Sequence, residues 1–299
     1  VNGHLTGSTM GRPGLTRNIV NTYLMRNGQR YTEQAGWATN SFVDECTDRD
    51  LRMAQTIRTP GYTRMGSNTK LAPDLNVSTT GYQPIKYLTE AKYDANKAST
   101  NDIPLFRLAE VYLNYAEAKA ELGTLAQVDI DKTIKLIRSR AGLPNLNMAT
   151  ANANPDPYLA SAETGYANVT GENKGVILEI RREGTLETLM EGLRYWDIMR
   201  WKEGKRFEKP FHGLYFSGTG EHDLDGDGNT DVWIYTTDTP PGTSTSVAYL
   251  KLGSDIVLSE GTYGYVVAHG SQPRTWVEPR DYLYPIPTDD RALTQGDIT

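Results

Sequence analysis

The sequence predicts a mainly α fold, a tetratricopeptide-like α/α superhelix with long ordered loops and short β-hairpins. Three patterns support this class. A helical hairpin is expected over residues 102–142, a long amphipathic helix over 174–203, and a loop and hairpin insertion over 204–280. The remaining segments are a loop-rich, ligand-side region over 1–101 and an extended tail over 281–299.

The long helix is predicted from the pattern of segment 176–201. Apolar side chains recur there at steps of three and four residues and share one stripe, formed by Leu186, Leu189, Leu193 and Trp196. Exposed ion pairs contribute only about 0.2 to 1 kcal/mol each. The segment also carries acidic and basic residues among its Tyr and Trp residues. We therefore expect ion pairs in a partly buried network, which holds neighbouring loops on the helix. The pairs expected at three-residue spacing are Glu179/Arg182, Glu191/Arg194, Arg194/Asp197 and Asp197/Arg200.

Two helices joined by a short connection make up the predicted hairpin. Asp102 is expected to cap the first helix, Pro104 to lie in its first turn, and Gly123 to mark its end. The second helix is expected over 128–140, followed by Gly142. This is about the 34-residue length of a tetratricopeptide unit, which should stack on other helices to bury both of its faces. The expected apolar faces are Leu108, Val111, Tyr112, Tyr115 and Ala116, and then Ile130, Ile134 and Ile137.

The segments outside these helices show shorter patterns. Region 1–101 is rich in Gly, Thr, Asn and Pro, and one short helix is expected over 14–25. After residue 204, alternating stretches at 232–235 and 264–267 predict hairpins or irregular strands. In the tail, two closely spaced prolines predict an extended chain over 282–287.

Composition excludes several classes of function. The chain has 31 basic and 37 acidic residues, a net charge of -6, and no basic block that could follow a phosphate backbone, so we expect no nucleic acid partner. Cys46 is the only cysteine, which excludes an intrachain disulfide and a cysteine-based zinc site. No apolar run approaches the roughly 18 to 20 residues of a membrane-spanning helix. The sequence contains no HExxH, GxSxG or phosphate-loop motif, so we predict that the protein is not an enzyme.

An acidic loop at 223–231, with the sequence DLDGDGNTD, is the sharpest local motif. Acidic residues at positions 1, 3, 5 and 9, with glycine at position 6, match the spacing by which one loop wraps oxygen ligands around calcium. Position 12 is Ile234 instead of Glu, so a further carboxylate would have to complete the shell. The alternative is a solvated acidic turn. The predicted ligands of a structural Ca²⁺ are Asp223, Asp225, Asp227, Asn229 and Asp231.

Candidate ligand-binding residues lie in the polar, loop-like segment 27–41. A sugar-binding site needs an aromatic platform flanked by polar donors and acceptors. Trp37 and Tyr31 could supply the platform, with Arg30 and Asn40 beside them, and Tyr62 is a weaker candidate, as are Tyr82 and Trp233. The alternative is that Trp37 covers a small core under the loops. Trp196 and Trp201 are expected to be packing residues.

Four blocks in order resemble the SusD/RagB-like family of glycan-binding lipoproteins. The first is DRDLR at 48–52 with PG at 60–61, and the second is RLAEVYLNYAEA at 107–118. The third is RRE at 181–183, followed by EGLRYWD at 191–197 and RW at 200–201. The fourth is YLYPIP at 282–287. Members of this family are usually much longer, so the chain resembles the C-terminal portion of such a protein, with the N-terminal part missing.

This resemblance implies a non-catalytic protein of the outer membrane and cell surface, lipid-anchored through an absent N-terminal segment. It would capture a glycan ligand and deliver it to a TonB-dependent transporter of the SusC type, over which it sits as a lid. The resemblance also places glycan contacts on loops of region 1–101. Two alternatives remain open: a helical-repeat scaffold for protein partners, and a glycoside hydrolase with two facing carboxylates.

Overall fold

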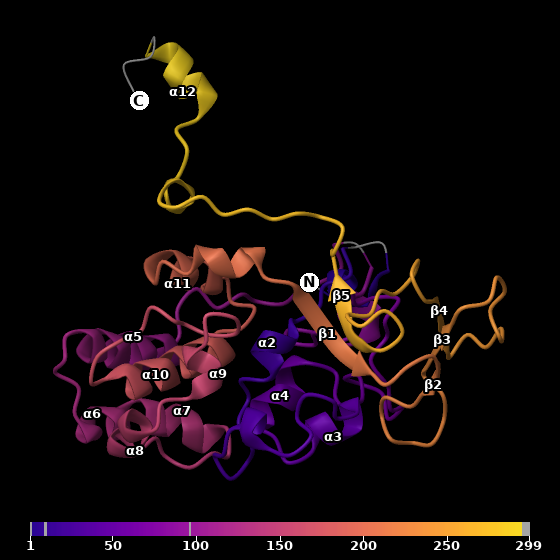
Figure 1. The fold of residues 1–299 in the computed structure, drawn as a ribbon, viewed down its shortest axis with the longest axis horizontal. Coiled ribbons are helices and arrows are strands. Elements are labelled where there is room, and N and C mark those ends of the chain that lie inside the picture. The colour runs from indigo at the N-terminus through magenta and orange to yellow at the C-terminus, as the bar shows by residue number, and fades with distance from the viewer. Residues whose placement is uncertain (1, 9–10, 96, 295–299) are drawn as a thin grey trace.

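The computed structural model describes residues 2–8, 11–95 and 97–294, and within them the chain is mostly helical (Figure 1). The helices are α1 Asn2–Thr6, α2 Arg17–Val20, α3 Phe42–Cys46, α4 Leu51–Thr56, α5 Leu108–Glu121, α6 Gln127–Lys132, α7 Ile134–Arg140, α8 Met148–Ala153, α9 Pro157–Ala160, α10 Lys174–Glu187, α11 Arg194–Arg200 and α12 Thr288–Leu293. The strands are β1 Phe211–Phe216, β2 Gly220–His222, β3 Val232–Tyr235, β4 Ala248–Lys251 and β5 Gly264–Ala268.

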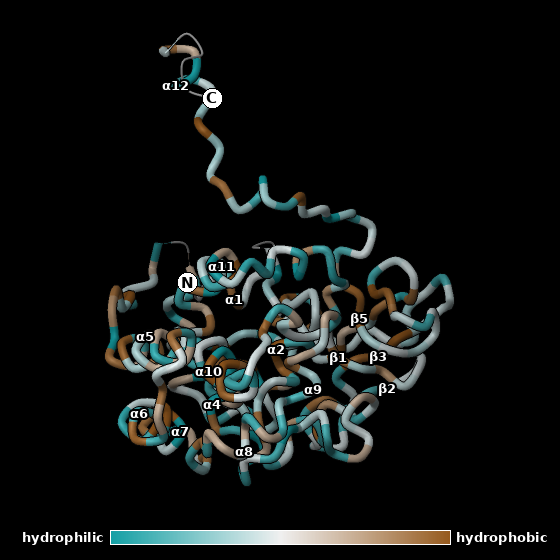
Figure 2. The backbone as a smooth tube through the Cα atoms, turned by 60° about the vertical axis from the view of Figure 1, so that its left-hand side comes forward, coloured by the Kyte–Doolittle hydropathy of each residue, from teal (hydrophilic) through white to brown (hydrophobic). Residues whose placement is uncertain are grey.

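Helix α10 lies at the centre of the helical half of the molecule. It contacts α5, α7 and α8, and Figure 2 shows it surrounded by other helices. Val176 and Leu178 are fully buried in a core that also contains Ile130 and Ile134. Because water is excluded around α10, each charged side chain on it needs a partner inside the protein. Among the described helices, none combines the length and hydrophobicity required to cross a bilayer.

The strands form two small sheets on the other side of the molecule. Strands β1 and β5 pair antiparallel, and β3 pairs antiparallel with β2 and parallel with β4. Val232 and Ile234 are fully buried while their neighbours along β3 are half-buried, which is the alternation expected of a strand with one face on a core. The strands expected at 232–235 and 264–267 are therefore confirmed. Their core also receives residues from the first part of the chain, such as Leu15 and Tyr82.

The prediction of one continuous long helix is wrong. Helix α10 ends at Glu187, and the chain turns before α11 begins at Arg194. Met190 and Gly192 have φ values of 63° and 82°, which lie in the left-handed region that a right-handed helix cannot contain. The predicted stripe is divided by this break. Leu186 and Leu189 are buried, but Trp196 is 52% exposed and stacks on Tyr284 of the tail at 5.9 Å, so it is not a core packing residue.

The predicted hairpin forms with changed limits. Its first helix begins at Leu108 instead of after Asp102, because Arg107 has an extended backbone and its side chain is held by Glu187 and Glu191. The second predicted helix is divided at Thr133 into α6 and α7. The apolar face predicted for α5 is only partly buried. Ala116 packs in the core, but Leu108, Val111 and Tyr115 are 61%, 59% and 46% exposed.

The short helix expected over 14–25 forms only one turn, α2. The tail is extended at 283–287, as predicted, but then forms α12 away from the rest of the molecule (Figure 1). The last five residues of the predicted tail, 295–299, lie outside the described residues.

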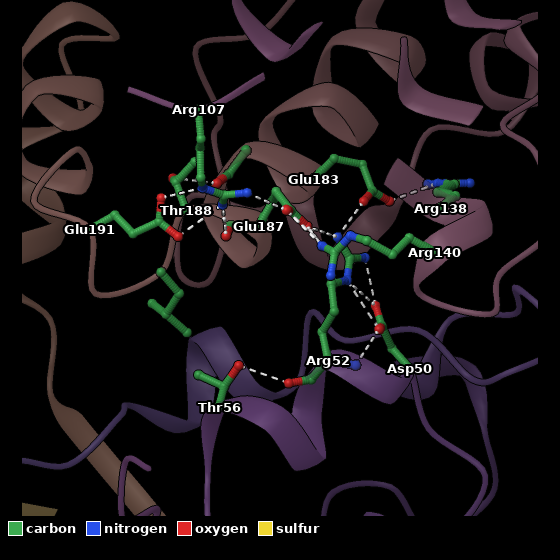
Figure 3. Close-up of polar contacts among 12 residues, drawn as sticks. Asp50, Arg52, Thr56, Arg107, Arg138, Arg140, Glu183, Glu187, Thr188 and Glu191 are labelled. Atoms are coloured by element: carbon green, nitrogen blue, oxygen red, sulfur yellow. Dashed lines mark hydrogen bonds and ion pairs between the residues drawn. The ribbon is translucent and has the colours of Figure 1, made fainter. Parts of the chain in front are cut away.

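The expected ionic network on the long helix is confirmed, and Figure 3 shows its central part. Glu183, Glu187 and Glu191 follow one another at four-residue spacing, so without partners their charges would repel. Each instead pairs with two cations at 2.5 to 2.9 Å: Glu183 with Arg52 and Arg138, Glu187 with Arg107 and Arg140, and Glu191 with Lys86 and Arg107. Four of these cations lie in α4 or α7 or directly before α5, so their pairs fasten these helices to α10, while Lys86 comes from the connection between α4 and α5.

Two of the four predicted pairs within the helix are formed. Glu179 pairs with Arg182 at 3.0 Å and Asp197 with Arg200 at 2.9 Å. The two pairs involving Arg194 are wrong. The break places Glu191 outside α11, and within α11 the Arg194 side chain is engaged by other partners. Arg194 instead donates hydrogen bonds to the hydroxyls of Thr185 and Tyr166, both at 3.0 Å.

Candidate functional site

The loop that carries Trp37 is held by a buried arginine at the start of α2. Arg17 is 3% exposed, and its Nη2 donates to the backbone oxygens of Trp37 and Ala38 at 3.0 and 3.2 Å. Glu45 lies 3.6 Å from the same guanidinium and balances its charge. From β5, the Tyr265 hydroxyl also donates to Ala38, at 3.0 Å. These bonds hold the backbone that carries the Trp37 ring.

A set of five half-buried rings gathers around this loop. Trp37 meets Tyr158 of α9 edge-on at 5.9 Å, and Tyr265 lies 5.8 Å from Tyr215 and 5.4 Å from His212 of β1. Arg17 connects the two groups, because it lies 4.6 Å above the Tyr265 ring while it binds the Trp37 carbonyl. We name this set the aromatic cluster: Trp37, Tyr158, His212, Tyr215 and Tyr265.

Neutral polar groups accompany the rings. The Tyr158 hydroxyl accepts a hydrogen bond from Asn21 at 3.1 Å and donates to Asn18 at 3.2 Å. Burial raises the pKa of Tyr158 to about 12, so the hydroxyl keeps its proton. Burial and the nearby Arg17 charge lower the pKa of His212, so its ring is neutral at pH 7. Ring faces with neutral donors and acceptors beside them suit a ligand that carries hydroxyl groups.

A small cavity adjoins the aromatic cluster. It has a volume of about 190 Å³, and its lining includes Ile198, Phe207 and Phe211 together with Asn18. Asn18 also accepts the Tyr158 hydrogen bond, so the cavity and the cluster share a wall. This arrangement gives the cluster an apolar recess in which one sugar ring or substituent could be held.

The acidic loop brings together three of its five predicted calcium ligands. Oxygens of Asp223, Asp225 and Asp227 lie within 4.8 Å of one another. Asn229 donates its side-chain amide to Asp227 at 3.0 Å, and Asp231 accepts from the backbone of Leu224 at 2.7 Å. Burial and the two neighbouring aspartates raise the pKa of Asp225, as expected where carboxylates lie close together. The loop therefore offers an oxygen-rich site of the kind that Ca²⁺ prefers.

Comparison with known proteins shows what the chain is similar to. The sequence model that describes the SusD family matches residues 2–296. The chain belongs to the SusD family. No curated protein matches its sequence. Two solved structures from Bacteroides fragilis NCTC 9343 share its fold: a SusD-like protein, with a TM-score of 0.59 and 19% identity, and a SusD-like carbohydrate binding protein, with a TM-score of 0.57 and 22% identity.

The matches cover nearly all of this SusD-family chain but less than half of each relative. They include 95% and 93% of this chain, and 46% and 47% of the two solved chains. At these identities the likeness shows the fold alone.

The predicted ligand residues of this SusD-family chain differ in burial and in the contacts that they make. Trp37 is half-buried in the aromatic cluster, whereas Tyr31 is 2% exposed with the Arg49 guanidinium 3.7 Å above its ring. The Tyr31 ring face is therefore covered by protein. Asn40 is half-buried and donates to the Tyr31 hydroxyl at 3.4 Å.

The other two predicted ligand residues make contacts of their own. Arg30 pairs with Glu33 at 2.7 Å and with Asp156 at 3.6 Å, so its charge is engaged beside the loop. Tyr62 lies next to Arg58, whose guanidinium is 5.4 Å from the ring, and its backbone pairs with the neighbouring segment at Leu71. These contacts place Tyr62 at a different part of the surface from Trp37.

Sequence reasoning missed Tyr158, Tyr265, Tyr215, His212 and Arg17. Tyr158 lies in a segment without clear periodicity, and no local pattern connects it with Trp37. The alternation of β5 does indicate that Tyr265 is on the opposite face from Val266, which is 4% exposed. The sequence does not reveal which loop covers that face.

Proposed function

We propose that this chain binds an oligosaccharide at the aromatic cluster and does not cleave it. The observation that carries the proposal is the half-buried group of rings around the Trp37 loop, whose backbone Arg17 holds at Trp37 and Ala38. A sugar presents C–H groups that pack on a ring face and hydroxyls that hydrogen-bond at its edge, and the cluster supplies both kinds of contact. The name of one solved relative, a SusD-like carbohydrate binding protein, supports the same ligand class.

Calorimetry against a panel of oligosaccharides tests this proposal. We expect Trp37→Ala to weaken binding by roughly tenfold or more, because the variant removes the most extended ring face of the cluster. Trp233→Ala is the matched control, since Trp233 is also half-buried but lies on β3 and stacks on Tyr249. Equal affinities of wild type and Trp37→Ala for every glycan that binds would contradict the proposal.

Product analysis of the same mixtures separates the two alternatives. Release of shorter sugars would indicate a glycoside hydrolase, and the absence of any glycan binding would favour a helical-repeat scaffold for protein partners. The structure weakens one route to hydrolysis. Glu183, Glu187 and Glu191 are each held by at least two basic side chains, so none of these carboxylates faces a free partner acid.

We further propose that the protein works at the outer surface of the outer membrane, anchored by lipid, and passes its glycan to a TonB-dependent transporter of the SusC type. Membership of the SusD family supports this role. The association would use a broad surface instead of one residue cluster. Co-purification with the transporter, compared with a chain lacking residues 283–294, measures whether the protruding tail contributes. Failure of the intact protein to associate would refute the proposal.

The exposed side of α5 supports a tetratricopeptide-like stacking of helices. Leu108, Val111 and Tyr115 form an uncovered apolar stripe at steps of three and four residues. We infer that further helices pack on this stripe, since the chain spans less than half the length of the two solved relatives that share its fold. A longer structure in which the stripe remained exposed to water would contradict this inference.

We propose that the acidic loop holds a structural Ca²⁺. The support is the calcium spacing together with the close approach of Asp223, Asp225 and Asp227. Calcium titration should raise the thermal midpoint of unfolding, because an ion that binds only the folded state stabilises it. Asp223→Asn should remove the rise, whereas Asp238→Asn, an exposed acid that pairs with Lys251 outside the loop, should keep it. A midpoint that does not respond to calcium would refute the site.

A further inference from the structure

The small cavity beside the aromatic cluster is large enough for part of a ligand. It lies where α2, α11 and β1 meet, and its volume is about 190 Å³. Pockets that enclose a whole ligand usually measure about 300 to 1,000 Å³, so this one suits a substituent that projects from a sugar held on the cluster. We name it the apolar recess after its walls, which are Ile19, Ile198, Phe207, Pro210 and Phe211.

The charged side chains of the lining are engaged outside the apolar recess. Arg194 donates to the Tyr166 hydroxyl at 3.0 Å, and the Arg206 guanidinium lies 4.7 Å from the centre of the same ring. Tyr166 is not part of the lining, so both charged ends are turned away and the aliphatic stems face the recess. The third cation, Lys209, pairs with Glu163 at 2.7 Å.

Two polar side chains of the lining keep a free hydrogen-bonding atom. Asn18 accepts the Tyr158 hydrogen bond through Oδ1, and within the described residues its Nδ2 has no acceptor. Glu163 binds Lys209 through Oε2, and no donor in the described part of the chain reaches its Oε1. The apolar recess therefore combines hydrophobic walls with one free donor and one free acceptor.

This combination selects among the substituents that sugars carry. A hydroxyl placed against the walls would lose the hydrogen bonds that water supplies. A carboxylate needs a free cation, whereas Arg194, Arg206 and Lys209 are all engaged. An acetamido group has a methyl for the walls, a carbonyl that accepts a hydrogen bond and an N–H that donates one, so it matches the recess in all three respects. An O-acetyl ester lacks the N–H and would leave the acceptor unused.

We propose that the apolar recess binds the acetyl group of a 2-acetamido sugar, so that the ligand is an oligosaccharide containing N-acetylhexosamine. The methyl packs on Ile198, Phe207 and Phe211. The carbonyl accepts from Asn18, and the N–H donates to Glu163. The inference rests on the proposed function and deepens it by naming the sugar class, because the ring that carries the substituent lies on the aromatic cluster.

Calorimetry on the intact chain compares sugars that differ only at C2. Di-N-acetylchitobiose is paired with cellobiose, and N-acetyllactosamine is paired with lactose. We expect the acetamido member of at least one pair to bind at least about tenfold more tightly than its partner. In saturation-transfer NMR, its acetyl methyl should receive the strongest signal from the protein. Acetamido members that fail to bind, or bind no more tightly than their partners in both pairs, would overturn the proposal.

Two variants locate the acetyl group. Asn18→Asp keeps the oxygen that accepts from Tyr158 but replaces the free donor with an acceptor, so the preference for the acetamido sugar should fall about tenfold. Ile19→Phe fills the recess from a half-buried position, and we expect a similar fall. The matched controls are Asn76→Asp and Val257→Phe, which are exposed, lie outside the lining and should keep the preference. A preference that survives in both folded recess variants would refute the site.

Trp37→Ala distinguishes this inference from the proposed function. The variant removes a ring of the aromatic cluster, so it should weaken binding of both members of a pair while the ratio of their affinities is kept. If both members bind with equal affinity, the recess assignment is refuted and the cluster is still supported. If no glycan of the panel binds, the proposed function is refuted and this inference fails with it.

Discussion

Removing one carboxylate from the centre of the ionic network should be expensive. Glu183 is fully buried, and its two oxygens lie 2.7 Å from Arg138 and 2.9 Å from Arg52, whose side chains are only 5% and 4% exposed. Glu183→Gln keeps the size of the side chain but removes its charge, and it turns amide protons toward a guanidinium that can only donate. Breaking a buried pair typically costs 3 to 5 kcal/mol.

The expected loss for Glu183→Gln is about 3 kcal/mol, at the lower end of that range. Each arginine keeps another acid, since Arg138 also binds Glu179 at 2.7 Å and Arg52 also binds Asp50 at 2.6 Å. Urea unfolding followed by circular dichroism measures the change. Glu121→Gln is the matched control, because its side chain is 48% exposed and should lose less than about 1 kcal/mol. A loss below about 1 kcal/mol for Glu183→Gln as well would refute the reasoning.

Two further predictions concern stability. Burial raises the pKa of Glu179, but Arg182 and Arg138 outweigh it and hold the pKa at about 2, below the ordinary 4.5. The ionised Glu179 therefore stabilises the fold above pH 4.5, and this stabilisation is lost as the pH falls toward 2. The urea midpoint should decline over that interval. A midpoint that does not change with pH would contradict the pairing. Leu178→Ala empties a fully buried position and should cost about 2 to 5 kcal/mol, against about 0.5 or less for Val111→Ala, which is 59% exposed. Equal losses in the two variants would show that α10 is not central.

Sequence periodicity predicted the helices and strands that are determined by their own residues. The alternation at 232–235 identified β3, and the helical spacing after residue 107 identified α5, although the helix starts later than expected. The break after Glu187 has a different origin. Glu191 is held by Lys86 and Arg107, which are far away in sequence, and these contacts accompany the turn at Met190. A periodic pattern cannot report contacts of this kind.

The candidate site shows the same division. Trp37 was identified because its own loop is polar and aromatic. Tyr158 and Tyr265 were not identified, since they come from α9 and β5 and meet Trp37 only through folding. Tyr31 was expected at the surface, but Arg49 covers its ring and the side chain is buried. Composition can therefore indicate that a ligand surface exists, whereas the rings that form it are assigned by tertiary structure.

The first part of the chain and the strands share one hydrophobic core, so neither is expected to fold as a separate fragment. Leu15 and Tyr82 pack in one cluster with Leu214 and Val266, so the intervening helices must be made before that cluster can close. Contacts so distant along the chain slow folding, because the polypeptide between them has to be ordered first. An expression fragment that ends after the helices would leave Leu15 and Tyr82 exposed to water, and we expect it to aggregate during synthesis.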